Sequence, residues 1–210
     1  MEVYPRGKAG LIEVICGPMF SGKTEELIRR LRRAKIARQR AIVFKPQIDK
    51  RYDEVLIVSH TAQKIPSIPV ADTAAMKRHL TDIHHQVDVV GIDEAQFFDN
   101  GLIQLVDDLA NRGLRVVVAG LDQDYLGNPF GPIPHLLAIA DLVSKQYAIC
   151  LVCGAPAGKT QRVKGRLRGE STHAQVQVGA IETYEARCRL CHVQDVAEPV
   201  KDIGHLELAG

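Results

Sequence analysis

Two kinds of apolar pattern alternate along the chain from residue 10 to residue 153. Short segments rich in Val and Ile are typical of buried strands, and apolar residues that recur every three or four positions are typical of amphipathic helices. We expect strands at residues 10–17, 40–46, 87–93, 114–122 and 146–153. We expect helices at residues 24–38, 69–83, 99–113 and 133–145, and irregular polar structure at 47–64. Strands that alternate with helices predict an α/β fold, with a parallel sheet covered on both faces.

Composition changes near residue 146, where long apolar segments end and Gly, Arg, Thr and Cys become frequent. We therefore predict an α/β domain at residues 1–145, a small second domain at 146–197 and a tail at 198–210. A chain of 210 residues is long enough for one large domain with such an appendage.

Charge and hydropathy argue against several classes of function. The formal net charge is +2, so the field of the whole molecule gives no argument for a nucleic-acid or membrane partner. The first ten residues lack the apolar core of a signal peptide, and no run of 18 apolar residues could span a bilayer. We expect a cytoplasmic protein, in which thiols stay reduced.

The segment GPMFSGKT at residues 17–24 fits the phosphate-binding loop pattern G-x-x-x-x-G-K-[ST]. Its context is also right, because a predicted strand precedes it and a predicted helix follows it. Gly17 and Gly22 let the backbone turn so that its N–H groups face a phosphate. Lys23 reaches the outer phosphates, and the Thr24 hydroxyl can bind Mg²⁺. The sequence therefore predicts a nucleotide site that works with Mg²⁺.

Two neighbouring acids, Asp93 and Glu94, come at the end of the predicted strand at residues 87–93. The magnesium partner of a phosphate-binding loop is an acid at the end of a neighbouring strand, and Asp93 fits this role. Side chains near a strand end point in opposing directions, so Glu94 can face another occupant of the cleft. A carboxylate there can take a proton from water or from a substrate alcohol. The acid pair thus predicts phosphoryl transfer and leaves the acceptor open.

The DEAQ segment and the basic helix at residues 24–38 also resemble parts of nucleic-acid helicases. A helicase motor needs two nucleotide-binding lobes, and the chain before the cysteines has room for one. We interpret the basic residues of the helix as a solvated face or an oligomer contact. They are Arg29, Arg30, Arg32, Arg33, Lys35 and Arg38. A nucleic-acid-binding ATPase and a regulatory ATP-binding module remain as alternatives.

Four of the five cysteines form two C-x-x-C pairs, Cys150 with Cys153 and Cys188 with Cys191. Four thiolates make a closed tetrahedral Zn²⁺ site, so we predict one structural Zn²⁺ per chain. Two redox-active pairs are the alternative. The fifth cysteine, Cys16, lies in an apolar segment and reads as a small buried hydrophobic residue.

The residues between the two cysteine pairs are polar and glycine-rich, so they should not form a core on their own. A loop held at both ends by zinc can close over a cleft as a lid. Tyr184 is its only aromatic residue, and it could contact a ligand or serve as a packing anchor. His192 could compete with Cys191 as a zinc ligand.

Several segments, in this order, resemble the type II thymidine kinases, the cellular thymidine kinase family. They are GPMFSGKT, GIDEAQFF, GLDQDYLGNPFGP and a C-x-x-C pair followed by CRLC. The match runs from about Leu11 to Val193, and the combination is far more specific than any single motif. The resemblance implies a RecA-like P-loop fold with a small zinc-ribbon domain that carries a lasso-like lid loop.

The resemblance also implies an activity, the transfer of the γ-phosphate of ATP to the 5′-hydroxyl of thymidine for the salvage of DNA precursors. Pocket shape discriminates the thymine methyl group by only about 1–3 kcal/mol, so deoxyuridine should be a substrate too. Members of the family usually form tetramers and are inhibited by thymidine triphosphate, and we expect both here. We expect no nucleic-acid partner.

Individual residues take the roles of the family residues that they match. Glu94 matches the general base, and Asp93 and Thr24 match the magnesium-side residues. The ATP-binding set is Gly17, Pro18, Met19, Phe20, Ser21, Gly22, Lys23, Thr24, Asp93 and Gln96. The nucleoside set is Asp49, Arg51, Phe97, Leu121, Tyr125, Phe130, Thr160, Val178 and Tyr184. The zinc ligands are Cys150, Cys153, Cys188 and Cys191.

Departures from the family pattern are small. Ala95 stands where some members have glycine, and Tyr125 stands where some have phenylalanine, which can alter the edge of the pocket. Neither residue belongs to the proposed chemistry. The tail from Glu198 to Gly210 has no matching motif.

Overall fold

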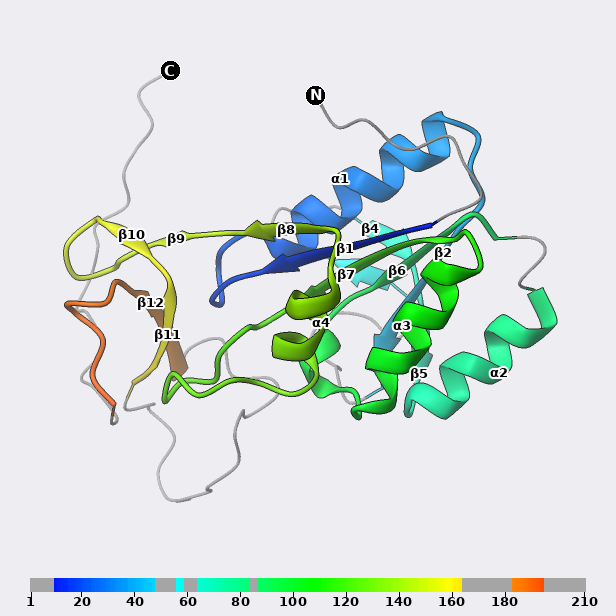
Figure 1. Ribbon diagram of the computed structural model, residues 1–210. Helices are drawn as coiled ribbons and strands as arrows, with labels where there is room; N and C mark the ends of the chain where they lie inside the picture. Colours follow the sequence, from blue (N-terminus) through cyan, green and yellow to red (C-terminus); the bar gives the residue numbers. More distant parts are fainter. Residues whose placement is uncertain (1–9, 48–55, 59–63, 84–86, 164–182, 195–210) are drawn as a thin grey trace.

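The computed structural model describes residues 10–47, 56–58, 64–83, 87–163 and 183–194 of the 210-residue chain. Its centre is a six-stranded sheet in the order β5-β2-β6-β7-β1-β8, and all neighbouring strands in it are parallel (Figure 1). The strands are β1 (Leu11–Cys16), β2 (Ala41–Pro46), β5 (Ile68–Val70), β6 (Val89–Ile92), β7 (Arg115–Gly120) and β8 (Leu142–Lys145). The helices are α1 (Lys23–Ile36), α2 (Thr73–Ile83), α3 (Gly101–Asn111) and α4 (Ile133–Ile139).

Helices cover both faces of the sheet. Successive residues of β1 show the division: Val14 belongs to an apolar cluster with side chains of α2, α3 and α4, and Ile15 belongs to a second cluster with side chains of α1. Strands buried on both faces explain the continuous Val and Ile segments in the sequence. The predicted α/β fold with a parallel sheet is confirmed. No helix formed by the described residues is long and apolar enough to cross a membrane.

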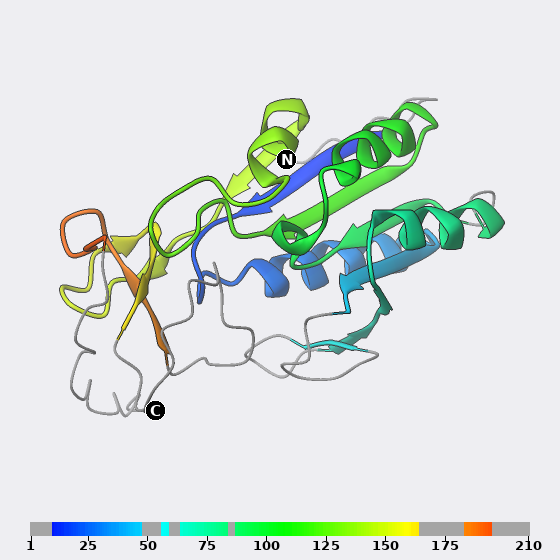
Figure 2. The same ribbon diagram turned by 90° about the horizontal axis from the view of Figure 1, so that it is seen from below.

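Four short strands lie beyond the carboxyl ends of β1 and β8, as the two views show (Figures 1 and 2). They are β9 (Ala148–Ile149), β10 (Pro156–Ala157), β11 (Lys159–Arg162) and β12 (Tyr184–Arg187). β9 pairs with β10 and β11 with β12, both antiparallel. The remaining described elements are an antiparallel pair, β3 (Leu56–Val58) and β4 (Lys64–Pro66), and a 3₁₀ turn, η2 (Ala95–Phe97). Ligands of open α/β sheets bind at the carboxyl ends of the strands, so β9 to β12 flank the expected site.

Both edge strands of the sheet differ from the predicted elements. The helix predicted at 133–145 ends at Ile139, and residues 142–145 form β8 beside β1. Asp141 stabilises this edge, because its carboxylate accepts the Ile12 N–H at 2.8 Å. A short apolar segment fits either period, and here the contact with β1 decides. At the other edge, β5 occupies the start of the helix predicted at 69–83, where Pro69 is tolerated because an edge strand needs fewer N–H donors.

A third difference concerns the strand predicted at 146–153. Only residues 148–149 are extended, as β9, and they lie outside the central sheet. The segment turns away because its second half forms the tight turn of the first cysteine pair, in which the Gly154 N–H donates to the Cys150 carbonyl oxygen at 2.8 Å. Part of the region predicted to be irregular, residues 56–58, forms β3.

A buried network of ion pairs joins α1 to the sheet. The carboxylate of Glu13, a fully buried residue of β1, accepts hydrogen bonds from Arg30 of α1 at 2.6 Å and from Arg115 of β7 at 2.5 Å. Arg30 also donates to Ser144 of β8 and to Glu26. Because Arg30 is only 3% exposed, the interpretation of the basic residues of α1 as a solvated face is wrong for this residue.

Arg30→Met should lower the free energy of unfolding by about 3–5 kcal/mol, because it deprives the buried Glu13 carboxylate of a partner. Arg29→Met is the matched control. Arg29 also pairs with Glu26, but its side chain is 50% exposed, so the loss should be below about 1 kcal/mol. Urea unfolding followed by circular dichroism measures both values. Equal losses in the two variants would contradict the anchoring role of Arg30.

Candidate active site and metal centre

The phosphate-binding loop connects β1 to α1, as its motif predicts. Both of its glycines are required by geometry, because Gly22 has φ 79° and a Cβ on Gly17 would lie 2.4 Å from the Gln146 carbonyl oxygen. Lys23 Nζ donates a hydrogen bond to the Pro18 carbonyl oxygen at 2.6 Å, which bends the ammonium group back over the loop. The loop and the start of α1 thus surround the place that a phosphate would take.

Asp93 follows β6 directly and lies beside Thr24. Its two carboxylate oxygens are 3.2 and 3.4 Å from the Thr24 hydroxyl oxygen, which donates the hydrogen bond. In the sheet, β7 lies between β1, which precedes the loop, and β6, which precedes Asp93. Thr24 and Asp93 meet because the carboxyl ends of these parallel strands lie at the same edge of the sheet. A hydroxyl and a carboxylate are oxygen ligands of the kind that Mg²⁺ accepts. The structure therefore brings together the two residues predicted for Mg²⁺.

Glu94 has a left-handed backbone conformation, with φ 49° and ψ 40°. This conformation is unfavourable for a long side chain and persists only where the surroundings hold it. Here the Glu94 N–H donates to the Asp93 carboxylate at 3.0 Å. The turn places Glu94 in the lining of a pocket together with Lys23, Thr24 and Leu121. The two neighbouring acids therefore occupy separate positions: Asp93 accepts a hydrogen bond from the Thr24 hydroxyl, and Glu94 lines the pocket.

The apolar and aromatic residues predicted to contact the nucleoside do not all lie in one part of the structure. Phe97 and Phe130 make an edge-to-face contact with ring centroids 5.8 Å apart, and Leu121 lines the pocket that contains Glu94. Tyr125 lies instead beside β11, where the Cζ atom of Arg162 is 5.4 Å from the centroid of its ring. The structure thus brings Phe97 and Phe130 together and connects Tyr125 to the strands beyond the sheet.

Thr160 lies against the phosphate-binding loop. Its hydroxyl oxygen, on β11, accepts the Met19 N–H at 3.0 Å, and the residue is 4% exposed. Tyr184 is buried in β12, opposite Arg162. The sequence places both residues in a polar loop, but the ends of this loop pair as strands, because pairing satisfies their backbone groups. The predicted contacts Asp49, Arg51 and Val178 lie outside the described residues.

Asp122 and Lys145 form a salt bridge at the carboxyl ends of β7 and β8 that the sequence analysis missed. The Lys145 Nζ atom is 2.7 Å from the Asp122 carboxylate, and this hydrogen bond raises the pKa of Lys145. Burial, with the nearby Asp122 charge, raises the pKa of Cys16 to about 11, so this thiol stays protonated. Asp122 could have been found in the sequence, because it follows its strand much as Asp93 follows β6.

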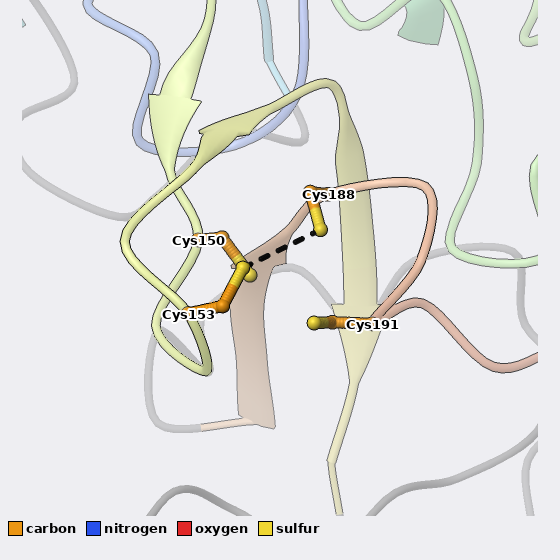
Figure 3. A group of neighbouring side chains, drawn as sticks. All are labelled: Cys150, Cys153, Cys188 and Cys191. Carbon is orange, nitrogen blue, oxygen red and sulfur yellow. Dashed lines mark hydrogen bonds between the residues drawn. The ribbon is translucent and has the colours of Figure 1, made fainter.

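The four paired cysteines surround a single point (Figure 3). Their Sγ atoms all lie within 4.8 Å of one another, and those of Cys153 and Cys188 are 3.7 Å apart. Sulfurs at about 2.3 Å from a tetrahedral Zn²⁺ would be about 3.8 Å apart, so the four cysteines fit this ion. His192 takes another partner, because its Nε2 atom lies 3.0 Å from the Tyr125 carbonyl oxygen. We call the described residues 148–163 and 183–194 the zinc module.

Backbone donors in the zinc module favour the thiolate form of two cysteines. Burial opposes ionisation of Cys150, but backbone N–H groups, first that of Cys188, outweigh it and lower the pKa of Cys150 to about 6. The backbone N–H of Cys191 likewise lowers the pKa of Cys188. A metal binds the thiolate, so Cys150 and Cys188 favour binding of an ion. The hydrogen bond with Cys188 instead raises the pKa of Cys191 to about 12, so a bound ion would have to displace that proton.

A known protein family matches this chain over most of its length. The model of the family described as thymidine kinase matches residues 10–192. This region covers most of the 210 residues and contains the phosphate-binding loop, the acid pair and all four clustered cysteines. Enzymes of this family are phosphotransferases that phosphorylate nucleosides in salvage. The resemblance noted in the sequence is thus confirmed, and the chain belongs to the thymidine kinase family.

Proposed function

We propose that this enzyme transfers the γ-phosphoryl group of ATP to the 5′-hydroxyl of thymidine. One observation carries the proposal. Glu94, Lys23 and Thr24 line the same pocket, and the Thr24 hydroxyl donates a hydrogen bond to the Asp93 carboxylate. This arrangement supports a role for Asp93 beside a cation and a role for Glu94 in proton transfer. A carboxylate in this position can take a proton, which supports phosphoryl transfer to an acceptor that has a hydroxyl group. Membership of the family supports a nucleoside as this acceptor.

In the proposed reaction, loop N–H groups and Lys23 hold the outer phosphates of ATP. Thr24 and Asp93 would hold Mg²⁺, which supplies positive charge against the phosphate oxygens when it is bound. The 5′-oxygen of the nucleoside forms a bond to the γ-phosphorus while the bond to the departing ADP oxygen breaks, and Glu94 accepts the hydroxyl proton. The products are ADP and the nucleoside monophosphate.

The nucleoside site has an apolar side in this proposal, formed by Leu121, Phe97 and Phe130. A thymine ring is flat and partly apolar, which suits two phenyl rings in edge-to-face contact. Exclusion of water by the bound nucleoside and a closing loop would favour transfer to the alcohol over hydrolysis of ATP. The other nucleoside contacts stay predictions; they are Asp49, Arg51, Tyr125, Thr160, Val178 and Tyr184.

Radiolabelled ATP and a panel of nucleosides test this proposal. Thymidine should give labelled monophosphate fastest, and kcat/KM for deoxyuridine should lie within about 10–200-fold of that for thymidine, because one methyl group separates them. The control is 5′-deoxythymidine, which has the base but no acceptor hydroxyl and should give no labelled product. If ATP turnover instead responds only to single-stranded DNA, the chain is a nucleic-acid-dependent ATPase and the proposal is wrong.

Further properties of the enzyme are proposed on family membership alone. They are assembly into homotetramers, inhibition by thymidine triphosphate and residence in the cytoplasm. The four cysteines would hold one structural Zn²⁺ per chain, a proposal that their geometry also supports. The division into domains at residues 1–145 and 146–197 likewise stays a prediction.

A further inference from the structure

Gln96 is a buried residue whose side-chain amide links Glu94 to the end of β7. Its Nε2 atom donates a hydrogen bond to Glu94 Oε2 at 2.5 Å, and its Oε1 atom accepts the Leu121 N–H at 3.0 Å. A backbone N–H can only donate, so the Leu121 contact determines which end of the amide is the oxygen. The NH₂ end must then face Glu94. The residue is 3% exposed, so water does not compete for these contacts.

Two glycines make room for Gln96. A Cβ on Gly120 would lie 2.8 Å from the Gln96 Oε1 atom, and a Cβ on Gly131 would lie 2.3 Å from the Gln96 carbonyl oxygen. Atoms cannot approach so closely without displacement, so both positions must lack a side chain for Gln96 to fit. Gly131 also has φ 53°, which glycine adopts readily. The surroundings therefore fix the backbone and the amide of Gln96 together.

We propose that Gln96 is a positioning residue that orients the Glu94 carboxylate for proton transfer. The inference rests on the proposed function, in which Glu94 is the general base. The Asp93 carboxylate accepts the Glu94 N–H, and the Gln96 amide donates to the Glu94 carboxylate. Glu94 is therefore held at its backbone and at the end of its side chain. A base held in the reacting orientation has less freedom to lose in the transition state. Gln96, predicted from the sequence to contact ATP, would act instead through Glu94.

The first test is Gln96→Met, which keeps the length of the side chain and removes the donor. We expect kcat with thymidine to fall by about 10–100-fold, because the base is no longer aligned. The KM for thymidine should stay within about threefold, so the loss should appear in kcat. The Kd of a non-hydrolysable ATP analogue should stay within about twofold. Gln104→Met is the control, since Gln104 is an exposed glutamine of α3 that contacts Asp108, and it should match the wild type.

Gln96→Glu is the second variant, and it decides the matter if Gln96→Met fails to fold. It keeps the shape of the side chain and its acceptor for the Leu121 N–H, but it places an acid beside Glu94. An ionised carboxylate cannot donate to Glu94, so kcat should fall at least as far as in Gln96→Met, and the Kd of the ATP analogue should again stay within about twofold.

Three outcomes would contradict the positioning role of Gln96 or the proposed function. If the variants weaken binding of the ATP analogue as much as they lower kcat, Gln96 contacts ATP and the positioning role is wrong. Unchanged kcat in both variants rejects the role as well. A wild-type enzyme that does not phosphorylate thymidine rejects the proposed function itself, so that assay is done first and separates the two failures.

Discussion

Glu94→Gln should lower kcat with thymidine by at least about a hundredfold and leave ATP binding near normal. Glutamine has the shape of glutamate, and its side-chain oxygen can still accept the hydrogen bond from Gln96. It cannot take a proton at neutral pH, so the 5′-hydroxyl would lose its proton acceptor in the pocket. The proposed nucleotide-binding residues Lys23, Thr24 and Asp93 are unchanged, so the affinity for ATP should persist.

Single-turnover phosphoryl transfer and equilibrium binding of an ATP analogue measure these two quantities separately. Glu25→Gln is the matched control, because Glu25 lines the same pocket from the first turn of α1. Its loss removes a favourable interaction with the helix dipole, worth at most about 1 kcal/mol, and kcat should stay within about fivefold. Transfer by Glu94→Gln at the wild-type rate would show that Glu94 is not the base.

Cys188→Ala should abolish zinc binding and unfold the zinc module while the central sheet remains folded. The apolar cluster of the zinc module has small side chains, and hydrophobic burial alone cannot hold it together. Its buried members are Ala148, Cys150, Ala157, Ala186 and Cys188. A structural Zn²⁺ supplies about 10–16 kcal/mol of apparent binding free energy, which exceeds what such a cluster can contribute. The sheet has its own large apolar cluster and does not depend on the ion.

Zinc analysis should find about one ion per wild-type chain and less than about a tenth of an ion per Cys188→Ala chain. Trypsin should cleave the variant first within the zinc module. Activity should fall more than about tenfold, because Thr160 would leave the Met19 N–H of the phosphate-binding loop. Cys16→Ala is the control for zinc content, since Cys16 is buried in β1 outside the cluster. Full zinc occupancy in Cys188→Ala would contradict the site of four thiolates.

The parts of the site that could be predicted from the sequence are local. The segment from Gly17 to Thr24 contains its own turn, phosphate donors and magnesium hydroxyl, so eight consecutive residues suggest the chemistry. Asp93 was predicted by its place at the end of an apolar strand. The cysteine pairs are far apart along the chain, but two C-x-x-C pairs are a typical pattern of ligands for a structural metal.

Contacts between distant segments could not be predicted in this way. No pattern near Gln96 indicates that its amide meets Leu121, and nothing near Thr160 indicates that its hydroxyl meets Met19. Strand β8 was missed because its short apolar sequence fits a helix equally well. Arg30 looked like the neighbouring arginines of α1. A signal was present for it, since Glu13 stands alone in a buried apolar strand and a buried carboxylate needs a cation.

The bond between Met19 and Thr160 joins residues that are 141 positions apart. During synthesis the ribosome releases every strand of the central sheet before it releases β11, and the earlier segments can fold first. The phosphate-binding loop is therefore made before the Thr160 hydroxyl that accepts one of its N–H groups. A chain whose translation stops before β11 lacks that support even if its sheet is complete.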